Sequence, residues 1–328
     1  MQGGKKLSRT RIYKAPDVLS KNAMVELAGY QGAGSILSVS LLSIAQSLEA
    51  SHLFGQISTT IDVTAQGESA AHLFQSVNLG ERQLCYAASG YLTALAPDLA
   101  VLDLPFTVTE RSLALASLDS TAGKLLSRTI EQHSNYRVLG FWDNGFRHIS
   151  NTFRPIHQPA DCQGLTIRTL DSAIYRESLN ALGFQSVTTD VSDLMRVIRS
   201  GEVQAQENPL TNYGNFKIYE HHPYLSMTGH FFGVLLLLCN RNWFDSLSEA
   251  QQHVLLEAAD QATAQQRALA AQQDTALQAV FTKHGTQIVA RSQLDLTQMQ
   301  RATVYIVERE RQNLSKPIVQ HYLDALEC

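Results

Sequence analysis

Residues 24–50 read MVELAGYQGAGSILSVSLLSIAQSLEA, and this stretch predicts the first strand, turn and helix of the fold. The apolar run from Met24 to Tyr30 indicates a strand, and Gln31-Gly32-Ala33-Gly34 indicates a turn. Ser35 is a favourable N-cap residue for a helix that we expect to reach about Ala50. A strand, a glycine-containing turn and a helix in this order are typical of the opening unit of a parallel α/β sheet.

The same alternation continues along the chain. Residues 57–63 alternate between apolar and polar side chains and predict a second strand. A helix through residues 70–79 is expected to end at Gly80, and residues 84–88 form the next apolar strand. This order predicts a doubly wound α/β domain with a parallel sheet.

A second α/β unit begins after Asn144. Residues 136–142 read as the last strand before this point, and residues 147–151 look extended after it. The following segments predict a strand at 164–168, a helix at 171–182 ended by Gly183, a strand at 184–187, and a helix at 192–200 ended by Gly201.

The C-terminal third is dominated by helical patterns. The apolar run 233–239 predicts a buried strand, and residues 246–284 then predict one long helix with Ser248 and Gln251 as a capping box. At 1.5 Å per residue this helix would be about 50–60 Å long, enough to brace two domains. Residues 296–326 predict a terminal helical region interrupted at Pro317.

Chain length favours two domains. A single hydrophobic core stops growing near about 250–300 residues, and this chain has 328. We therefore expect a flexible N-terminus at 1–22, domain I at 23–145 and 234–273, domain II at 146–233 and 301–328, and a bracing helix and crossover at 274–300.

Composition excludes several classes of protein. The chain is 44% hydrophobic, which excludes dominant disorder, and only 17% charged. Its formal net charge is -4, and it lacks a basic stripe with interleaved aromatic residues, so nucleic-acid binding is not expected. No apolar run is long enough to span a bilayer, and no export signal is visible.

Sequence motifs for a cofactor, a metal or a nucleophile are missing. Neither a phosphate-binding loop nor the G-x-S-x-G motif occurs, and Gly29, Gly32 and Gly34 have the wrong spacing for a dinucleotide site. The four cysteines lack C-x-x-C spacing, so we expect free thiols. No cofactor and no metal are expected.

Two arginines stand out against this weakly charged background. Arg168 ends the short apolar strand Leu165-Thr166-Ile167, where a charge is costly unless it is paired. At the carboxyl end of a strand its planar fork suits bidentate recognition of a ligand carboxylate. The spacing is equally compatible with a structural ion pair to a neighbouring Asp or Glu. Arg147 lies near the expected domain junction.

Five segments, in this order, give the chain its resemblance to a known family. They are Asp103-Leu104-Pro105-Phe106, Gly145-Phe146-Arg147-His148-Ile149-Ser150-Asn151, Arg154-Pro155-Ile156, Gly164-Leu165-Thr166-Ile167-Arg168 and Gln206-Glu207-Asn208-Pro209-Leu210. Over roughly residues 24–310 the chain resembles the solute-binding proteins of TRAP (tripartite ATP-independent periplasmic) transporters, in the branch named for dicarboxylate uptake.

The resemblance implies two α/β domains with a ligand cleft between them and a long bracing helix. It also implies which residues contact the ligand. The arginine that pairs with the ligand carboxylate matches Arg168, a second ligand contact matches Arg147, and the asparagine of the Q-E-N-P segment matches Asn208.

Further candidates follow from position. Tyr213 lies five residues after Asn208, and Gln31 and Ser89 match pocket-facing stretches of domain I. Asp171 replaces an uncharged residue of some members and is expected to orient Arg168 or to contact ligand hydroxyls or an amine. Trp142 is also a candidate ligand contact, because it is an aromatic residue near the expected crossover. Aromatic residues at such positions more often pack in a hinge than contact a ligand.

The implied function is capture of a small organic acid and its delivery to TRAP membrane permease subunits. The protein is then expected to be a periplasmic monomer and not an enzyme. The rival hypothesis is a sensor or regulatory module of the same fold without a transport role. A third is an α/β enzyme that uses Arg168 and Glu207.

Overall fold

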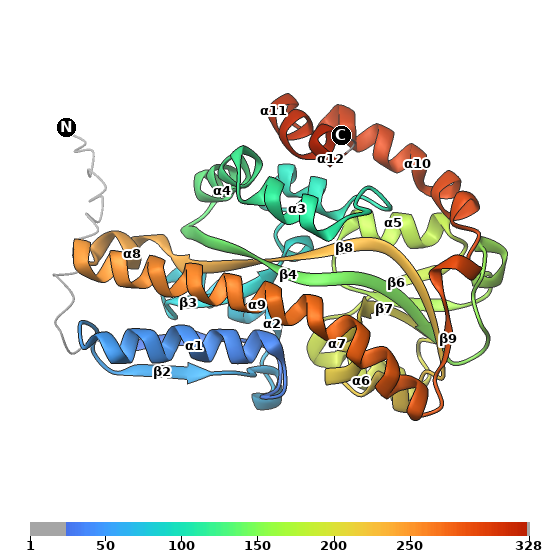
Figure 1. Ribbon diagram of the computed structural model, residues 1–328, viewed down its shortest axis with the longest axis horizontal. Helices are drawn as coiled ribbons and strands as arrows, with labels where there is room; N and C mark the ends of the chain where they lie inside the picture. Colours follow the sequence, from blue (N-terminus) through green and yellow to red (C-terminus); the bar gives the residue numbers. More distant parts are fainter. Residues whose placement is uncertain (1–23, 327–328) are drawn as a thin grey trace, which may run out of the picture.

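A computed structural model describes residues 24–326 of the chain (Figure 1). The described residues contain one nine-stranded sheet in the order β2-β1-β3-β8-β4-β7-β5-β6, with β9 paired to β8. The expected flexible N-terminus at 1–22 and Cys328 lie outside the described residues. Cys85, Cys162 and Cys239 are free thiols, and all three are buried.

The first unit of the sheet follows the predicted alternation. Ser35 accepts a hydrogen bond from the Leu37 backbone and begins the first helix, and Gly80 ends the second in the left-handed conformation. We call this part the first unit; it consists of β1 (Val25–Ala28), α1 (Ile36–Ser51), β2 (Ile57–Thr60), α2 (Ala70–Leu79) and β3 (Leu84–Ala88). Its strands are parallel.

The second unit has the same organisation. It consists of β5 (Thr166–Thr169), α5 (Ala173–Ala181), β6 (Gln185–Thr188), α6 (Leu194–Ser200) and β7 (Ala205–Pro209). Gly201 ends α6 in the left-handed conformation, as the sequence predicts. The parallel strands β5, β6 and β7 form the opposite end of the sheet from the first unit.

Two long strands connect the units, and here the sequence-based boundaries are wrong. The strand β4 runs without interruption from Tyr136 to Asn151, and β8 runs from Tyr224 to Asn240. They pair antiparallel along most of their length, with irregularities at Val138/Gly140, Asp143/Gly145 and Arg147/Ile149. The residues that suggested a restart near Asn144 therefore form a bulge inside one strand. We call β4 and β8 the crossing strands.

The long helix α9 (Glu249–Lys283) spans both units, as predicted (Figure 1). It packs against α1 of the first unit and against α7 (Leu210–Asn215) beside the second. Gln266 of this helix exchanges two hydrogen bonds with the Asp143 backbone, at 2.7 and 2.8 Å, and so fixes the helix against β4. The capping box of Ser248 and Gln251 is present.

Removing that cap has a predictable effect. Ser248→Ala is expected to lower the free energy of unfolding by about 1 kcal/mol, because the Ser248 side chain accepts from the Gln251 backbone at the helix start. Urea denaturation measures the change, and Ser248→Asp, which retains an acceptor, is expected to lose much less. Equal losses in both variants would contradict the cap's contribution.

The terminal helices pack differently from the expected assignment of 301–328 to domain II. Ile318 and Tyr322 are buried in the same core as the first unit, and Figure 1 shows α11 and α12 beside α3 and α4. The domain boundaries otherwise remain predictions. The remaining helices and strand are α3 (Arg111–Leu118), α4 (Thr121–His133), α8 (Arg241–Ser246), β9 (Gln287–Val289), α10 (Leu296–Asn313), α11 (Lys316–Ile318) and α12 (Asp324–Leu326).

Candidate ligand site between the two units

Arg168 is buried at the end of β5 and is held by the backbone. Only 2% of the residue is exposed, and its Nε and Nη2 donate to the Thr189 carbonyl at 2.9 and 2.5 Å. Within residues 24–326 no carboxylate forms an ion pair with it. The alternative of a structural ion pair for Arg168 is therefore wrong in this structure.

The surroundings of Arg168 favour an incoming anion. Burial lowers the pKa of its guanidinium, since a charge in a low-dielectric interior is poorly solvated, whereas nearby Tyr91 and Glu207 raise it. A buried guanidinium with unused donors gains most from a charge-assisted, bidentate carboxylate. The site is thus suited to bind one acidic group.

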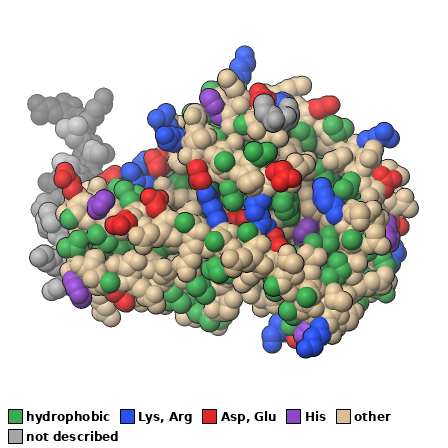
Figure 2. Space-filling view, in the orientation of Figure 1, with side chains coloured by type: hydrophobic (Ala, Val, Ile, Leu, Met, Phe, Trp, Pro, Cys, Tyr) green, Lys and Arg blue, Asp and Glu red, His purple; other side chains and the backbone are tan. Residues whose placement is uncertain are grey.

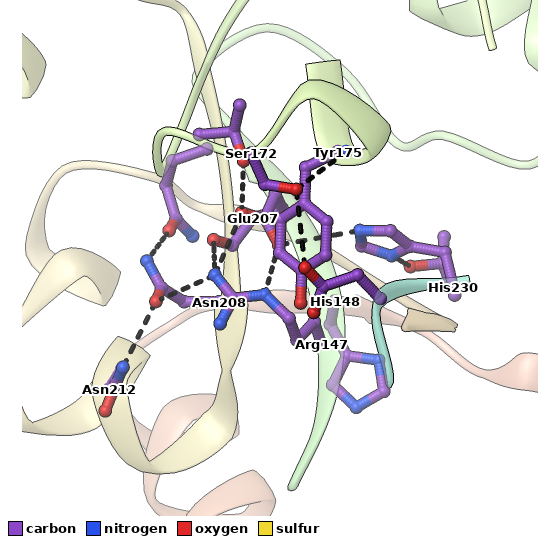
Figure 3. A network of polar contacts seen from close by, with 12 residues as sticks. Arg147, His148, Ser172, Tyr175, Glu207, Asn208, Asn212 and His230 are labelled. Atoms are coloured by element: carbon purple, nitrogen blue, oxygen red, sulfur yellow. Dashed lines mark hydrogen bonds and ion pairs between the residues drawn. The ribbon is translucent and has the colours of Figure 1, made fainter. Parts of the chain in front are cut away.

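Arg147 has an internal partner. Its Nη2 donates to Glu207 Oε1 at 2.9 Å and its Nε donates to Glu207 Oε2, so the pair is bidentate (Figure 3). Burial alone would raise the pKa of Glu207, but the Arg147 charge lowers it to about 2. Glu207 is fully buried and ionised. It is paired with Arg147, the residue that was expected to be a second ligand contact.

A chain of amides links this pair to the first unit. Arg147 Nη2 donates to Asn208 Oδ1 at 3.3 Å, and Asn212 Nδ2 donates to the same oxygen at 3.2 Å. Gln31 Nε2 then donates to Asn212 Oδ1 at 2.8 Å from the turn after β1. The candidates Arg147, Asn208 and Gln31 therefore belong to one network that crosses between the units.

A second contact between the units surrounds Asp103. Ser89 Oγ donates to Asp103 Oδ1 at 2.7 Å, and Ser172 Oγ at the start of α5 donates to Oδ2 at 3.4 Å. Burial raises the pKa of Asp103 to about 6, although the hydrogen bond from Ser89 opposes the shift. Ser89 thus lies beside the contact between the units, and its role as a ligand contact stays a prediction.

This raised pKa predicts a specific pH dependence. A carboxyl group whose pKa is about 6 folded and about 4 unfolded binds its proton first in the folded state. Its contribution therefore increases the free energy of unfolding as the pH falls from 7 to 5, by about 1 kcal/mol. In Asp103→Asn this part of the gain should be missing when urea denaturation is compared at the two pH values. An unchanged pH dependence in the variant would contradict the assignment.

Three of the predicted site residues lie outside the polar network that contains Arg147, Asn208 and Gln31. Tyr213 lies in the apolar core of the second unit, edge-on to Phe281, and its hydroxyl donates to the His222 carbonyl at 2.6 Å. Trp142 is fully buried and donates to Thr263 Oγ1 at 3.0 Å. Asp171 is exposed and does not contact Arg168; the carboxylates near Arg168 are Glu207 and Asp190.

Sequence reasoning missed several residues of the site. Glu207 was considered only as part of the Gln206–Leu210 segment and as a residue of the enzyme hypothesis. Asn212 and Asp103 were not proposed as site residues. A usable signal existed for Glu207, because a charge inside the strand Ala205–Pro209 requires a buried partner. No comparable signal existed for Asn212, whose contacts come from Gln31 and Asn208.

This geometry defines a class of protein: two α/β units joined by crossing strands, with a buried arginine between them that lacks an acidic partner in residues 24–326. Residues 34–313 match the model of a family described as bacterial extracellular solute-binding protein, family 7. The chain belongs to this family. The expected family resemblance and the two-domain α/β fold are confirmed.

Individual relatives agree with this assignment. An uncharacterized protein of Haemophilus influenzae is 31% identical over 68% of each chain. The 2,3-diketo-L-gulonate-binding periplasmic protein of Escherichia coli is 29% identical over 62% of each chain. Among solved structures, the sugar acid binding protein of Advenella mimigardefordensis in complex with galactonate is 22% identical, with a TM-score of 0.87 over 93% of this chain and 98% of that one.

The family membership decides between the three functional hypotheses. It supports the transport role of a binding protein and gives no support to the sensor module. It also excludes the enzyme hypothesis, because members of the family bind solutes and do not transform them. Among residues 24–326, no helix is both long and apolar enough to cross a membrane.

Proposed function

We propose that this protein captures a small organic acid through Arg168 and delivers it to the permease subunits of a TRAP transporter. One observation carries the proposal: Arg168 is 2% exposed and oriented by the Thr189 carbonyl, and no carboxylate of residues 24–326 neutralises it. A ligand carboxylate would supply the missing charge in a site that excludes most water.

The class of acid follows from the polar side chains at the interface between the units. Ser89, Asn208, Gln31 and Asn212 carry hydroxyl and amide groups that now bond to other side chains of the protein, and such groups suit ligand hydroxyls. Relatives point the same way, since one solved structure holds galactonate and another, from Polaromonas, is bound to D-erythronate. We therefore propose a hydroxylated monocarboxylate, such as a sugar acid, as the ligand.

Binding is proposed to be coupled to the contact between the units. Gln31 and Asn212, and Asp103 and Ser172, already touch across the interface. A ligand held between the same surfaces would stabilise this arrangement over one in which the units are apart. The permease would then recognise the arrangement in which the units are in contact.

A thermal-shift screen tests the proposal. We expect D-galactonate, D-erythronate or another hydroxy acid to raise the midpoint of unfolding, by RT ln(1 + [L]/Kd) in free energy, or about 2.7 kcal/mol at 100 times Kd. Galactitol and erythritol, which keep the hydroxyls but lack the carboxylate, serve as matched controls. Stabilisation by the alditols as large as that by the acids would overturn the role of Arg168.

The remaining parts of the proposal concern location and assembly. A periplasmic location is supported by the relatives, including the Escherichia coli periplasmic protein. We propose that the protein acts as a monomer and binds no nucleic acid, in agreement with its net charge of -4. Light scattering of the purified protein at micromolar concentration checks the oligomeric state, and a dimeric mass would contradict it.

A further inference from the structure

A cavity of 210 Å³ lies against the crossing strands. Residues of both crossing strands, of α9 and of the segment after β9 line it. Its walls combine the apolar side chains of Phe146, Leu210 and Met227 with the polar side chains of His148, Gln278 and Arg291. We call it the crossing-strand cavity.

This cavity lies on the other face of β4 from the Arg147–Glu207 pair. Phe146 and His148 line the cavity, whereas Arg147 between them does not line it and pairs with Glu207 instead. Figure 3 shows the His148 ring turned away from the Arg147–Glu207 pair. An occupant of the cavity would therefore contact the strand segment that carries Arg147 without touching the site of Arg168.

Arg291 gives the cavity its recognition group. Its Nη1 donates to the Thr228 carbonyl at 2.6 Å, and it lies so close to Gly229 that a Cβ atom there would meet Nη1 at 2.7 Å. Arg291 is exposed as a residue, and the partial burial of its guanidinium lowers its pKa. No carboxylate in residues 24–326 forms an ion pair with Arg291, which donates to a backbone carbonyl as Arg168 does but is more exposed.

The one carboxylate in the wall of the cavity is already paired. Asp274 of α9 accepts from Arg111 Nη2, and Arg111 Nε lies 3.2 Å from Asp143 Oδ2. Basic and acidic side chains accordingly lie side by side on the face shown in Figure 2, near the middle of the molecule. Asp274 is therefore engaged by Arg111, whereas the remaining donors of Arg291 are available.

From these observations we infer that the crossing-strand cavity is a second binding site, for a small organic anion with an apolar body. The carboxylate pairs with Arg291, and the apolar part packs against Phe146, Leu210 and Met227. The size is adequate, because a protein cavity of about 150 Å³ holds benzene. A cavity of 210 Å³ has room for benzoate.

Benzoate is the probe, and Arg168→Ala is the background, because this variant removes the proposed acid site between the units. Isothermal calorimetry and saturation-transfer NMR on the full chain are expected to show binding of benzoate with a Kd on the order of 1 mM, as befits a ligand of this size. Benzyl alcohol and benzylamine have similar shapes but a neutral or a positive head group. Both are expected to bind at least 10-fold more weakly than benzoate.

Two further substitutions in this background locate the site. Arg291→Ala removes the charge, and Met227→Trp fills the cavity; each should weaken benzoate binding at least 10-fold. Arg291 is exposed and Met227 is half-buried, and circular dichroism checks that both variants fold. Arg301→Ala, an exposed arginine on α10, is the control and should bind benzoate normally.

The inference is overturned if benzoate does not bind the Arg168→Ala background, or if its binding survives in the folded Arg291→Ala variant. Tighter binding of benzylamine than of benzoate would also overturn it, since Asp274 would then be the recognition group. These outcomes are separate from those of the proposed function, which concerns hydroxy acids at Arg168. Either proposal can fail while the other stands.

Discussion

Arg168→Ala should weaken binding of the acid ligand on the order of 100-fold or more while leaving the fold intact. Truncating one partner of a buried charge pair removes about 2–5 kcal/mol of binding free energy, largely because the ligand carboxylate would remain desolvated and unpaired. The fold should tolerate the change, because Arg168 donates to a single protein group, the Thr189 carbonyl. Calorimetry with the best acid from the thermal-shift screen measures the loss.

Two control variants separate recognition from packing. Arg154→Ala removes another arginine that is held only by backbone carbonyls, those of Asp161 and Gln163, and should leave binding unchanged. Arg168→Lys keeps the charge but loses the planar fork, so its affinity should lie between those of the wild type and the alanine variant. Wild-type affinity in a folded Arg168→Ala protein would disprove the assigned role.

Local signals in the sequence were sufficient for much of the fold. The cap at Ser248 and the glycine stops at Gly80 and Gly201 are where the pattern indicates. These features depend on neighbours within about four residues of one another. Their energetics are contained in the local sequence.

The crossing strands were harder to predict because their register is a long-range property. Gly145 has a φ of +86°, and such a glycine is as typical of a loop as of a bulge in a continuous strand. Pairing with β8 decides between the two, and β8 is some 80 residues further along the chain. The sequence pattern near Asn144 therefore indicated a break that the sheet does not contain.

The site was predicted in part for the same reason. Arg168 could be found because a charge at the end of an apolar strand requires an explanation. The partner of Arg147 could not be found, since Glu207 is 60 residues away and meets it only through the pairing of β4 with β7. Tyr213 was misplaced because the turn at Pro209 begins a helix that directs its ring toward Phe281.

Glu207→Ala is expected to cause the largest loss of stability, about 3–5 kcal/mol, because it leaves the Arg147 guanidinium buried without its carboxylate. Urea denaturation at pH 7 measures the loss. The exposed pair of Glu177 and Arg309 is the matched control, and Glu177→Ala should lose less than about 1 kcal/mol.

A double variant tests whether the loss in Glu207→Ala comes from the uncompensated charge. Arg147→Met removes the charge that Glu207 would otherwise balance, so Arg147→Met combined with Glu207→Leu should lose clearly less than the sum of the two single changes. The pair also predicts acid sensitivity. With a pKa of about 2 folded and about 4.3 unfolded, Glu207 contributes stability that is complete at neutral pH and is lost as the pH falls from about 5 to 2. In the double variant that acid-dependent loss should be smaller.

A Glu207→Ala protein as stable as the wild type, with the same acid profile, would show that Glu207 does not compensate the charge of Arg147.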